Sequence, residues 1–277
     1  MDLEDDTDGF TIELDGAVLS GIERGDGVPV VFLHAGVADH RMWLAQVAAV
    51  AEAGYHAVAY DRRGFGETTA TDEPFSHLDD LVELLDALDI HAAVLVGSSM
   101  GGALAVDFAL THPGRTAGLV LIGTALSGFA PEISDTDELM EAAIADAEER
   151  GDPEFIARVY AHAWLDGPRS ASGRVAGPLR ERVLATIRNN LAKPVLRHER
   201  RASPALDRVP AIVAPTLLIA GDLDFDYTVA LHETLSEDLP NVFAAVIEGT
   251  AHFPSLERPD LVDPLLVQFL DSLTGGD

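Results

Sequence analysis

The stretch Ala93-Val94-Leu95-Val96-Gly97-Ser98-Ser99-Met100-Gly101-Gly102-Ala103-Leu104-Ala105 decides the fold. An apolar run ends at Gly97, a turn of small residues follows, and an alanine-rich helical segment extends to about Leu110. The turn reads G-x-S-x-G with Ser99 at its centre, which is typical of a sharp strand-to-helix turn that exposes a serine hydroxyl. Glycines flanking the serine avoid a clash there, and the helix N-terminus favours a developing anion. We therefore predict that Ser99 is a nucleophile; the alternative is a glycine-rich turn that only packs.

Apolar runs and helical periodicities alternate on both sides of this stretch. Further strands are predicted at residues 10–14, 17–22, 28–33, 56–60, 119–122, 211–220 and 243–247. Helices are predicted at residues 41–53, 77–88 and 256–273, with Pro259 and Pro264 breaking the first turns of the last one. This alternation indicates an α/β fold with a mostly parallel, doubly wound sheet.

The pattern changes between residues 127 and 206. Strand-like apolar runs stop there, and charged helical segments separated by glycine and proline take over. Sheets of this kind bind ligands at the carboxyl ends of their strands. We therefore expect residues 127–206 to form a helical cap over those ends, inserted between two parts of one core, residues 1–126 and 207–277. The alternative is a group of helices beside the sheet that does not cover the site.

The charge of the chain is strongly negative. Its 277 residues include 47 Asp and Glu against 18 Lys and Arg, a net charge of −29, and Lys193 is the only lysine. Such a surface repels nucleic acid and anionic lipid. An acidic, lysine-poor surface resembles proteins of salt-accumulating haloarchaea, so we expect a halophilic protein; an acidic mesophilic protein is the alternative.

Cysteine is absent, which excludes disulfides, thiolate catalysis and zinc–thiolate sites.

No apolar stretch reaches 18 residues, so no membrane span is expected. The acidic start, Met1-Asp2-Leu3-Glu4-Asp5-Asp6, lacks the basic and apolar regions of a secretory signal, and a cytoplasmic location is therefore expected.

A nucleophilic serine needs a base within hydrogen-bond reach and an acid that orients the base. After a turn of this kind the chain order is serine, acid, histidine. Asp224 follows the strand that ends near residue 220, and His252 follows the last strand, so we predict them as acid and base. Asp222 and Asp226 are the alternative acids and are expected to be solvated instead.

The other histidines lack such a position. His40 and His77 are among those expected at the surface, whereas His162 in the cap is a candidate contact for substrate.

A calcium loop is a competing interpretation of the acidic stretch. Asp222, Asp224, Asp226 and Glu233 have positions 1, 3, 5 and 12 of such a loop, but its sixth position, normally glycine, is Tyr227. A buried strand rather than a helix precedes the stretch, which also disfavours calcium.

An oxyanion hole needs two backbone N–H groups. Met100, directly after the serine, is the first predicted donor, and Gly36, in the loop after the strand ending at residue 33, is the second. Ala35 and Val37 are the alternatives for the second donor. His34 is expected to brace this loop rather than to transfer protons.

Five motifs together resemble the α/β-hydrolase fold superfamily, in its large group of esterases, lactonases and C–C hydrolases. They are Leu33-His34-Ala35-Gly36, Tyr60-Asp61-Arg62-Arg63-Gly64-Phe65-Gly66, Gly97-Ser98-Ser99-Met100-Gly101-Gly102, Gly221-Asp222-Leu223-Asp224 and Gly249-Thr250-Ala251-His252-Phe253. Two departures stand out: Ala35 replaces the usual glycine after the histidine, and Phe225 and Asp226 occupy positions where proline is frequent. Members with an aspartate nucleophile, the haloalkane dehalogenases and epoxide hydrolases, are disfavoured because the turn holds Ser99.

The resemblance implies a serine hydrolase of EC 3.1.1 type that cleaves a small or medium carboxylic ester or lactone through an acyl-Ser99 intermediate. It implies no metal, no organic cofactor, a small-molecule acyl substrate, and a monomer or homodimer. The alternatives are a C–C bond hydrolase or a perhydrolase with the same triad, or a ligand-binding protein with slow turnover. Trp164 is predicted to bind substrate; Trp164, Tyr160, Phe155 and Phe129 either line the pocket or pack beside it.

Overall fold

The computed structural model describes residues 7–275. The acidic segment Met1–Asp6, on which the expected cytoplasmic location rests, lies outside these residues. Nine strands occur in the described part: β1 (Asp8–Leu14), β2 (Ala17–Arg24), β3 (Pro29–Leu33), β4 (His56–Tyr60), β5 (Thr69–Ala70), β6 (Ala93–Ser98), β7 (Thr116–Ile122), β8 (Thr216–Gly221) and β9 (Val242–Ile247). The helices are α1 (Leu44–Glu52), α2 (His77–Ala87), α3 (Met100–Thr111), α4 (Asp135–Arg150), α5 (Pro153–Tyr160), α6 (Pro178–Leu191), α7 (Asp226–Asp238), α8 (Pro254–Glu257) and α9 (Pro259–Thr274).

The strands form a single sheet in the order β1-β2-β4-β3-β6-β7-β8-β9, with the short β5 paired to β2. The hairpin β1–β2 is antiparallel, and β2 pairs antiparallel with β4. All pairs from β4 to β9 are parallel. The predicted α/β fold with a mostly parallel sheet is therefore confirmed.

Several element boundaries differ from the expectation, and three of them have a local cause. The helix predicted from residue 41 begins as a 3-10 turn, His40–Trp43, before α1. The strand predicted from residue 211 begins only at Thr216, because Leu206–Ala211 forms another 3-10 turn. The closing helix is divided where Pro259 starts α9, since proline suits a first helical position; Pro264 lies inside α9.

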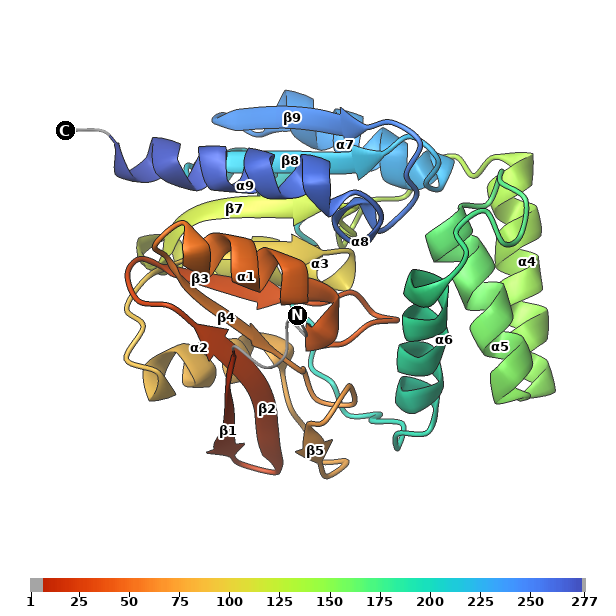
Figure 1. Ribbon diagram of the computed structural model, residues 1–277, viewed down its shortest axis with the longest axis horizontal. Coiled ribbons are helices and arrows are strands. Elements are labelled where there is room, and N and C mark those ends of the chain that lie inside the picture. Colours follow the sequence, from red (N-terminus) through yellow and green to blue (C-terminus); the bar gives the residue numbers. More distant parts are fainter. Residues whose placement is uncertain (1–6, 276–277) are drawn as a thin grey trace.

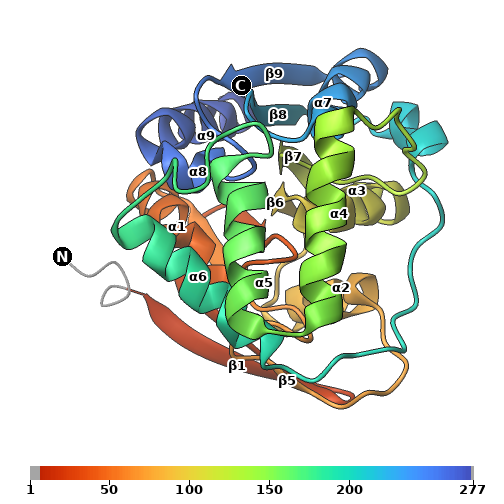
Figure 2. The same cartoon turned by 90° about the vertical axis from the view of Figure 1, so that its right-hand side faces the viewer.

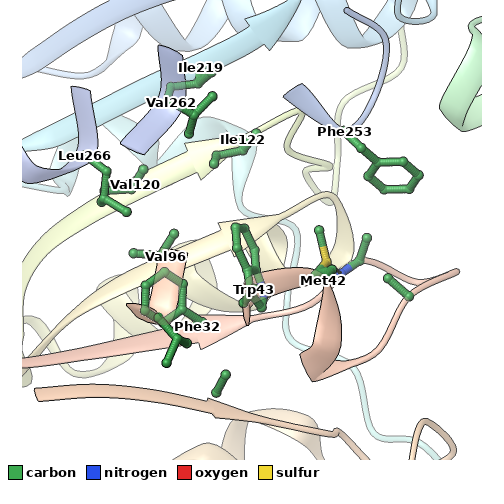
Figure 3. Packing of buried hydrophobic residues seen from close by; sticks show 14 of the residues in the cluster. Phe32, Met42, Trp43, Val96, Val120, Ile122, Ile219, Phe253, Val262 and Leu266 are labelled. Carbon is green, nitrogen blue, oxygen red and sulfur yellow. Dashed lines mark hydrogen bonds between the residues drawn. The ribbon is translucent and has the colours of Figure 1, made fainter. Parts of the chain in front are cut away.

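Alternating strand residues build two cores, one on each face of the sheet. Phe32, Val96 and Val120 point to the side covered by α1 and α9, where Trp43 and Leu266 pack against them (Figure 3). Their neighbours in sequence, Val31, Leu95 and Leu121, point to the opposite side of the sheet. There they belong to a second core with buried residues of α2, α3 and α7, namely Leu85, Phe108 and Leu235. In the central strands, continuous apolar runs therefore mark burial on both faces, whereas β9 is apolar but largely exposed at the edge of the sheet.

Helices α4, α5 and α6 lie beyond the carboxyl ends of the parallel strands, at the right of Figure 1. Viewed from that side, they stand in front of β6 and β7 (Figure 2). A π-helical turn, η4 (Ala161–Asp166), continues α5. We call residues 135–191 the cap helices; the domain limits at 127 and 206 remain a prediction. Among residues 7–275, no helix has the length and apolarity that crossing a bilayer requires.

The serine turn is packed so closely that a methyl group has no room in it. A Cβ atom on Gly101 would lie 2.1 Å from the carbonyl oxygen of Leu33, whereas a Cβ on Gly114 meets nothing within 4 Å. We expect Gly101→Ala to lower the free energy of unfolding by about 1–3 kcal/mol, because overpacking forces the backbone apart. Gly114→Ala is the matched control, with an expected change within about 0.5 kcal/mol. Denaturant unfolding measures both, and equal stabilities would contradict this account of the turn.

Candidate active site

Ser99 lies between β6 and α3 in a strained backbone conformation. Its φ is 53° and its ψ is −117°, and among residues 7–275 only Asp89 shares a positive φ without being glycine. Two hydrogen bonds hold the turn against the end of β7: Ser99 N donates to Ile122 O at 3.0 Å, and Ser99 O accepts from Ala125 N at 3.0 Å. The side chain is half-buried. Strain of this kind persists only where the surrounding structure enforces it, and it is frequent at functional sites.

Asp224 and His252 are brought together although 28 residues separate them. The Asp224 Oδ2 atom lies 2.7 Å from His252 Nδ1, and Asp224 Oδ1 accepts a hydrogen bond from Phe225 N at 2.8 Å. Both side chains are buried. His252 Nε2 is buried as well and has no hydrogen-bond partner in the described part of the chain. Because the carboxylate holds Nδ1, the remaining ring nitrogen is available to accept a proton.

A cavity of about 680 Å³ connects these groups. Ser99 and His252 both line it, and so do Gly36 and Met100. Of the predicted cap residues, Trp164 lines the cavity, together with Tyr160 and Phe129 from the set expected to line or pack the pocket. His162 does not line it; its Nε2 pairs with the carbonyl oxygen of Ser170 at 2.9 Å. Phe155 lies elsewhere too, with the Arg150 guanidinium 4.8 Å from its ring centroid.

The loop after β3 approaches the first turn of α3. A Cβ atom on Gly36 would lie 2.5 Å from Met100 Sδ, so only glycine leaves room for the Met100 side chain here. Met100 is the first residue of α3, and its backbone N–H therefore has no acceptor within the helix. Gly36 and Met100 thus lie side by side next to Ser99 at the cavity wall. The N-terminal end of α3, where partial positive charge favours a developing anion, therefore lies at the cavity wall.

The model of the alpha/beta hydrolase family matches residues 30–264. The chain belongs to the alpha/beta hydrolase family. A Bacillus subtilis (strain 168) protein named "Putative 2-succinyl-6-hydroxy-2,4-cyclohexadiene-1-carboxylate synthase" is 31% identical over 231 residues, covering 78% of this chain and 81% of that protein.

Two solved structures resemble this hydrolase over most of its length. A thermophilic esterase from Thermogutta terrifontis, with malate bound, has a TM-score of 0.76 at 26% identity and covers 96% of this chain and 99% of its own. Est816, described as an N-acyl homoserine lactone degrading enzyme, has a TM-score of 0.65 at 29% identity and covers 94% and 100%. These similarities agree with the observed fold and with hydrolysis as the general chemistry.

Two arginines in the cap segment between η4 and α6 form hydrogen bonds with the loops that carry Asp224 and His252 in this hydrolase. Arg174 donates to the carbonyl oxygen of Gly249 at 2.8 Å and pairs with Glu257 at 2.6 Å, and Glu257 in turn accepts from Ala251 N at 2.7 Å. Within the cap, Arg174 also donates to the carbonyl oxygens of two residues of η4, Leu165 and Asp166. The loop that carries His252, which we call the histidine loop, is therefore connected to the cap through charge-assisted hydrogen bonds, which are stronger than neutral ones.

Arg169 makes the corresponding contacts to the loop that carries Asp224, which we call the acid loop. Its Nη2 donates to the carbonyl oxygens of Asp222 at 3.0 Å and of Asp224 at 3.3 Å, and its Nη1 pairs with Asp226. In addition, His252 N donates to the carbonyl oxygen of Trp164 at 3.1 Å. Sequence reasoning missed both arginines, because an irregular loop carries no periodicity that marks its contacts.

The three aspartates of the acid loop have different partners. Asp224 faces His252, Asp226 pairs with Arg169, and Asp222 Oδ1 accepts a hydrogen bond from Gly249 N at 2.6 Å. Asp222 is exposed, as expected, and it also braces the histidine loop. The carboxylates do not converge on one centre, and residues 7–275 contain no cluster of three or more potential metal ligands.

Gly123 is a further residue that sequence reasoning missed. It follows β7 with a φ of +50°, and a Cβ atom on it would lie 3.1 Å from His252 O and 3.3 Å from His252 Nδ1. A side chain here would press against the Asp224–His252 pair. Its position directly after a predicted strand is the signal that could have identified it.

His34 braces the loop of Gly36, as expected. Its Nδ1 donates to the carbonyl oxygen of Ala35 at 2.8 Å, and its Nε2 accepts from Arg62 N at 3.1 Å. Burial, with the nearby charge of Arg62, lowers the pKa of His34 to about 3. The ring is therefore neutral at ordinary pH, in agreement with one donor and one acceptor nitrogen.

The expectation that His40 and His77 lie at the surface is wrong. His40 is buried with its Nδ1 3.0 Å from Asp61 Oδ2, and Asp61 also accepts from His40 N and Glu67 N, both at 2.7 Å. His77 is half-buried and its Nδ1 is covered completely. The sequence shows no periodicity that pairs His40 with Asp61, because the two meet through a turn and a strand end.

The His40–Asp61 pair has opposite pKa shifts. Burial acts against both charges, but the hydrogen bond and the mutual attraction outweigh it, so the pKa of Asp61 falls to about 2 and that of His40 rises above its ordinary value of 6.5. A raised histidine pKa stabilises the folded state fully below pH 6.5, and this contribution is lost as the pH rises through the folded value.

We therefore expect His40→Asn to lower the free energy of unfolding by about 3 kcal/mol at pH 6, since it leaves a buried carboxylate without its cation. The loss is expected to be smaller at pH 9, where the wild-type imidazole is neutral as well. Denaturant unfolding at the two pH values measures the difference. His91→Asn, at an exposed histidine, is the control. A loss that is the same at both pH values would show that the pair carries no charge.

Proposed function

We propose that this protein is a cofactor-independent serine hydrolase that cleaves a small or medium carboxylic ester or lactone. The observation that carries the proposal is the Asp224–His252 hydrogen bond of 2.7 Å, which leaves a buried, unpartnered Nε2 on a cavity that Ser99 also lines. The solved relatives described as an esterase and as a lactone-degrading enzyme support this chemistry.

In the proposed mechanism, His252 removes the proton of Ser99 as the hydroxyl attacks the substrate carbonyl. Asp224 holds the imidazole and stabilises its cation. The N–H groups of Met100 and Gly36 bind the oxyanion, where preorganised donors lower the barrier. His252 then protonates the leaving group, and water activated by the same ring hydrolyses acyl-Ser99.

We further infer that the acidic surface is adapted to concentrated salt. A net charge of −29 creates strong self-repulsion in dilute buffer. In molar salt the Debye length falls to about 3 Å, which screens this repulsion. Activity measurements are therefore best made in about 2 M KCl, which lies within this screened regime.

The test of the nucleophile is labelling by a fluorophosphonate probe. Wild type is expected to be labelled and Ser99→Ala to lose both labelling and ester hydrolysis, because Ser99 is the serine of the turn that lines the cavity. Ser98→Ala is the matched control, since Ser98 is the adjacent serine and is fully buried in β6; it is expected to keep its label. A folded wild type without label, or a labelled Ser99→Ala, contradicts the mechanism and favours a ligand-binding protein.

The arginine contacts predict that the cap positions the proposed base. We expect Arg174→Gln to lower kcat by about ten- to a hundredfold, since a displacement of about 1 Å costs up to about 10²-fold. KM is expected to change little, because Arg174 does not line the cavity. Arg174→Lys keeps the charge and is expected to recover part of kcat, whereas Arg150→Gln, at an exposed arginine paired within α4, is the control.

A second readout separates positioning from a general loss of stability. The low-field proton resonance of His252 Nδ1–H is expected to shift or broaden in Arg174→Gln at temperatures where the variant remains folded. An unchanged resonance and an unchanged kcat would show that Arg174 only stabilises the cap.

A further inference from the structure

A second cavity of about 350 Å³ adjoins the main one. The two share Gly36, Val37, Met100 and Tyr160 in their walls. We call the second one the side cavity. The shared residues include Gly36 and Met100, the proposed oxyanion donors, so the side cavity lies next to the proposed position of the substrate carbonyl.

Charged groups line the side cavity, and most of them already have partners. Arg63 donates to both carboxylate oxygens of Asp80 at 2.8 Å, so its charge is balanced. Glu199 pairs with Arg201 at 3.4 Å, and its charge also acts on the fully buried Arg62. Arg63 is therefore balanced by Asp80, whereas the charge of Glu199 is only weakly balanced by Arg201, whose side chain is largely exposed.

Lys193 is the exception. It is the single lysine of the chain, it is half-buried, and it lines the side cavity just after α6. Its ammonium group has no ion pair or hydrogen bond with any residue from 7 to 275. A cation without a partner in an enclosed wall is screened less by salt than one at the open surface.

A second polar group without a partner lies in the same wall. His77 Nδ1 is buried and unpartnered within the described residues, and burial holds the pKa of this imidazole well below its usual range. A neutral imidazole still carries one N–H donor. The Nδ1 atom is covered by protein, so Lys193 is the described residue of this wall that offers a free positive charge to an anionic ligand such as a carboxylate.

We propose that the side cavity binds a carboxylate at the far end of the substrate, with Lys193 as its counterion, so that the preferred substrates are half-esters of dicarboxylic acids. This inference rests on the proposed serine hydrolase function. The net charge of −29 repels anions at long range, and molar salt removes that repulsion. Recognition then depends on the short-range contact with Lys193.

The experiment compares monomethyl with dimethyl esters of dicarboxylic acids, from glutarate to suberate, in 2 M KCl. The measured quantity is the ratio of kcat/KM for the half-ester to kcat/KM for the diester. We expect Lys193→Met to lower this ratio about tenfold or more through KM, because a hydrogen bond to a charged group contributes about 1.5–3 kcal/mol. Lys193→Arg is expected to keep most of the ratio.

Arg258→Met is the matched control. It removes one positive charge at an exposed position, where Arg258 pairs only with the neighbouring Asp260. The ratio is expected to stay at its wild-type value in this variant. A ratio that Lys193→Met and Arg258→Met leave equally unchanged would overturn the inference, and equal decreases would show a general charge effect and overturn it as well.

A binding measurement separates this inference from the proposed function. Calorimetry with monomethyl glutarate on Ser99→Ala is expected to detect binding that the additional Lys193→Met change removes. If wild type hydrolyses both esters without dependence on Lys193, the carboxylate site fails and the hydrolase stands. If wild type hydrolyses neither ester but binding depends on Lys193, the carboxylate site stands and the hydrolase fails.

Discussion

The strained backbone of Ser99 is the constraint on which the rest of the site depends. A φ of 53° is unfavourable for serine, and the conformation persists because hydrogen bonds to Ile122 O and from Ala125 N hold it against the end of β7. Gly101 lets the following helix approach β3 closely. The sheet register, the start of α3 and the approach of the Gly36 loop are therefore linked, and together they place the serine beside the Asp224–His252 pair.

Much of this arrangement could be predicted from the sequence, because strand ends are visible there. Asp224 follows the buried strand β8 and His252 follows the apolar but largely exposed edge strand β9, and parallel strands bring their carboxyl ends to one edge of a sheet. The same reasoning failed where contacts come from irregular segments. Neither Arg174 nor the burial of His40 could be predicted, since each depends on how a loop folds against residues far away in the sequence.

The buried charges show how an acidic chain keeps an ordered interior. Asp61, Asp80 and Asp166 are all buried, and each faces a cationic side chain or several N–H donors. Leaving such a carboxylate unpaired costs several kcal/mol, and His40, Arg63 and Arg180 balance these three. Most of the excess negative charge remains outside, where water and salt ions solvate it. Lys193, in contrast, has no acidic partner among residues 7–275, which is why we consider it a candidate for binding a ligand rather than for stabilising the fold.

The arginine contacts between the cap and the loops that carry Asp224 and His252 have a consequence for how such proteins diversify. In a modular enzyme, a cap can be exchanged to obtain a new specificity while the core stays intact. Here Arg169 holds the backbone carbonyl groups of Asp222 and Asp224, and Arg174 holds that of Gly249, so a transplanted cap that lacks them would also change the core. Recombination between this chain and a relative is therefore expected to succeed only when the cap and the two loops are inherited together.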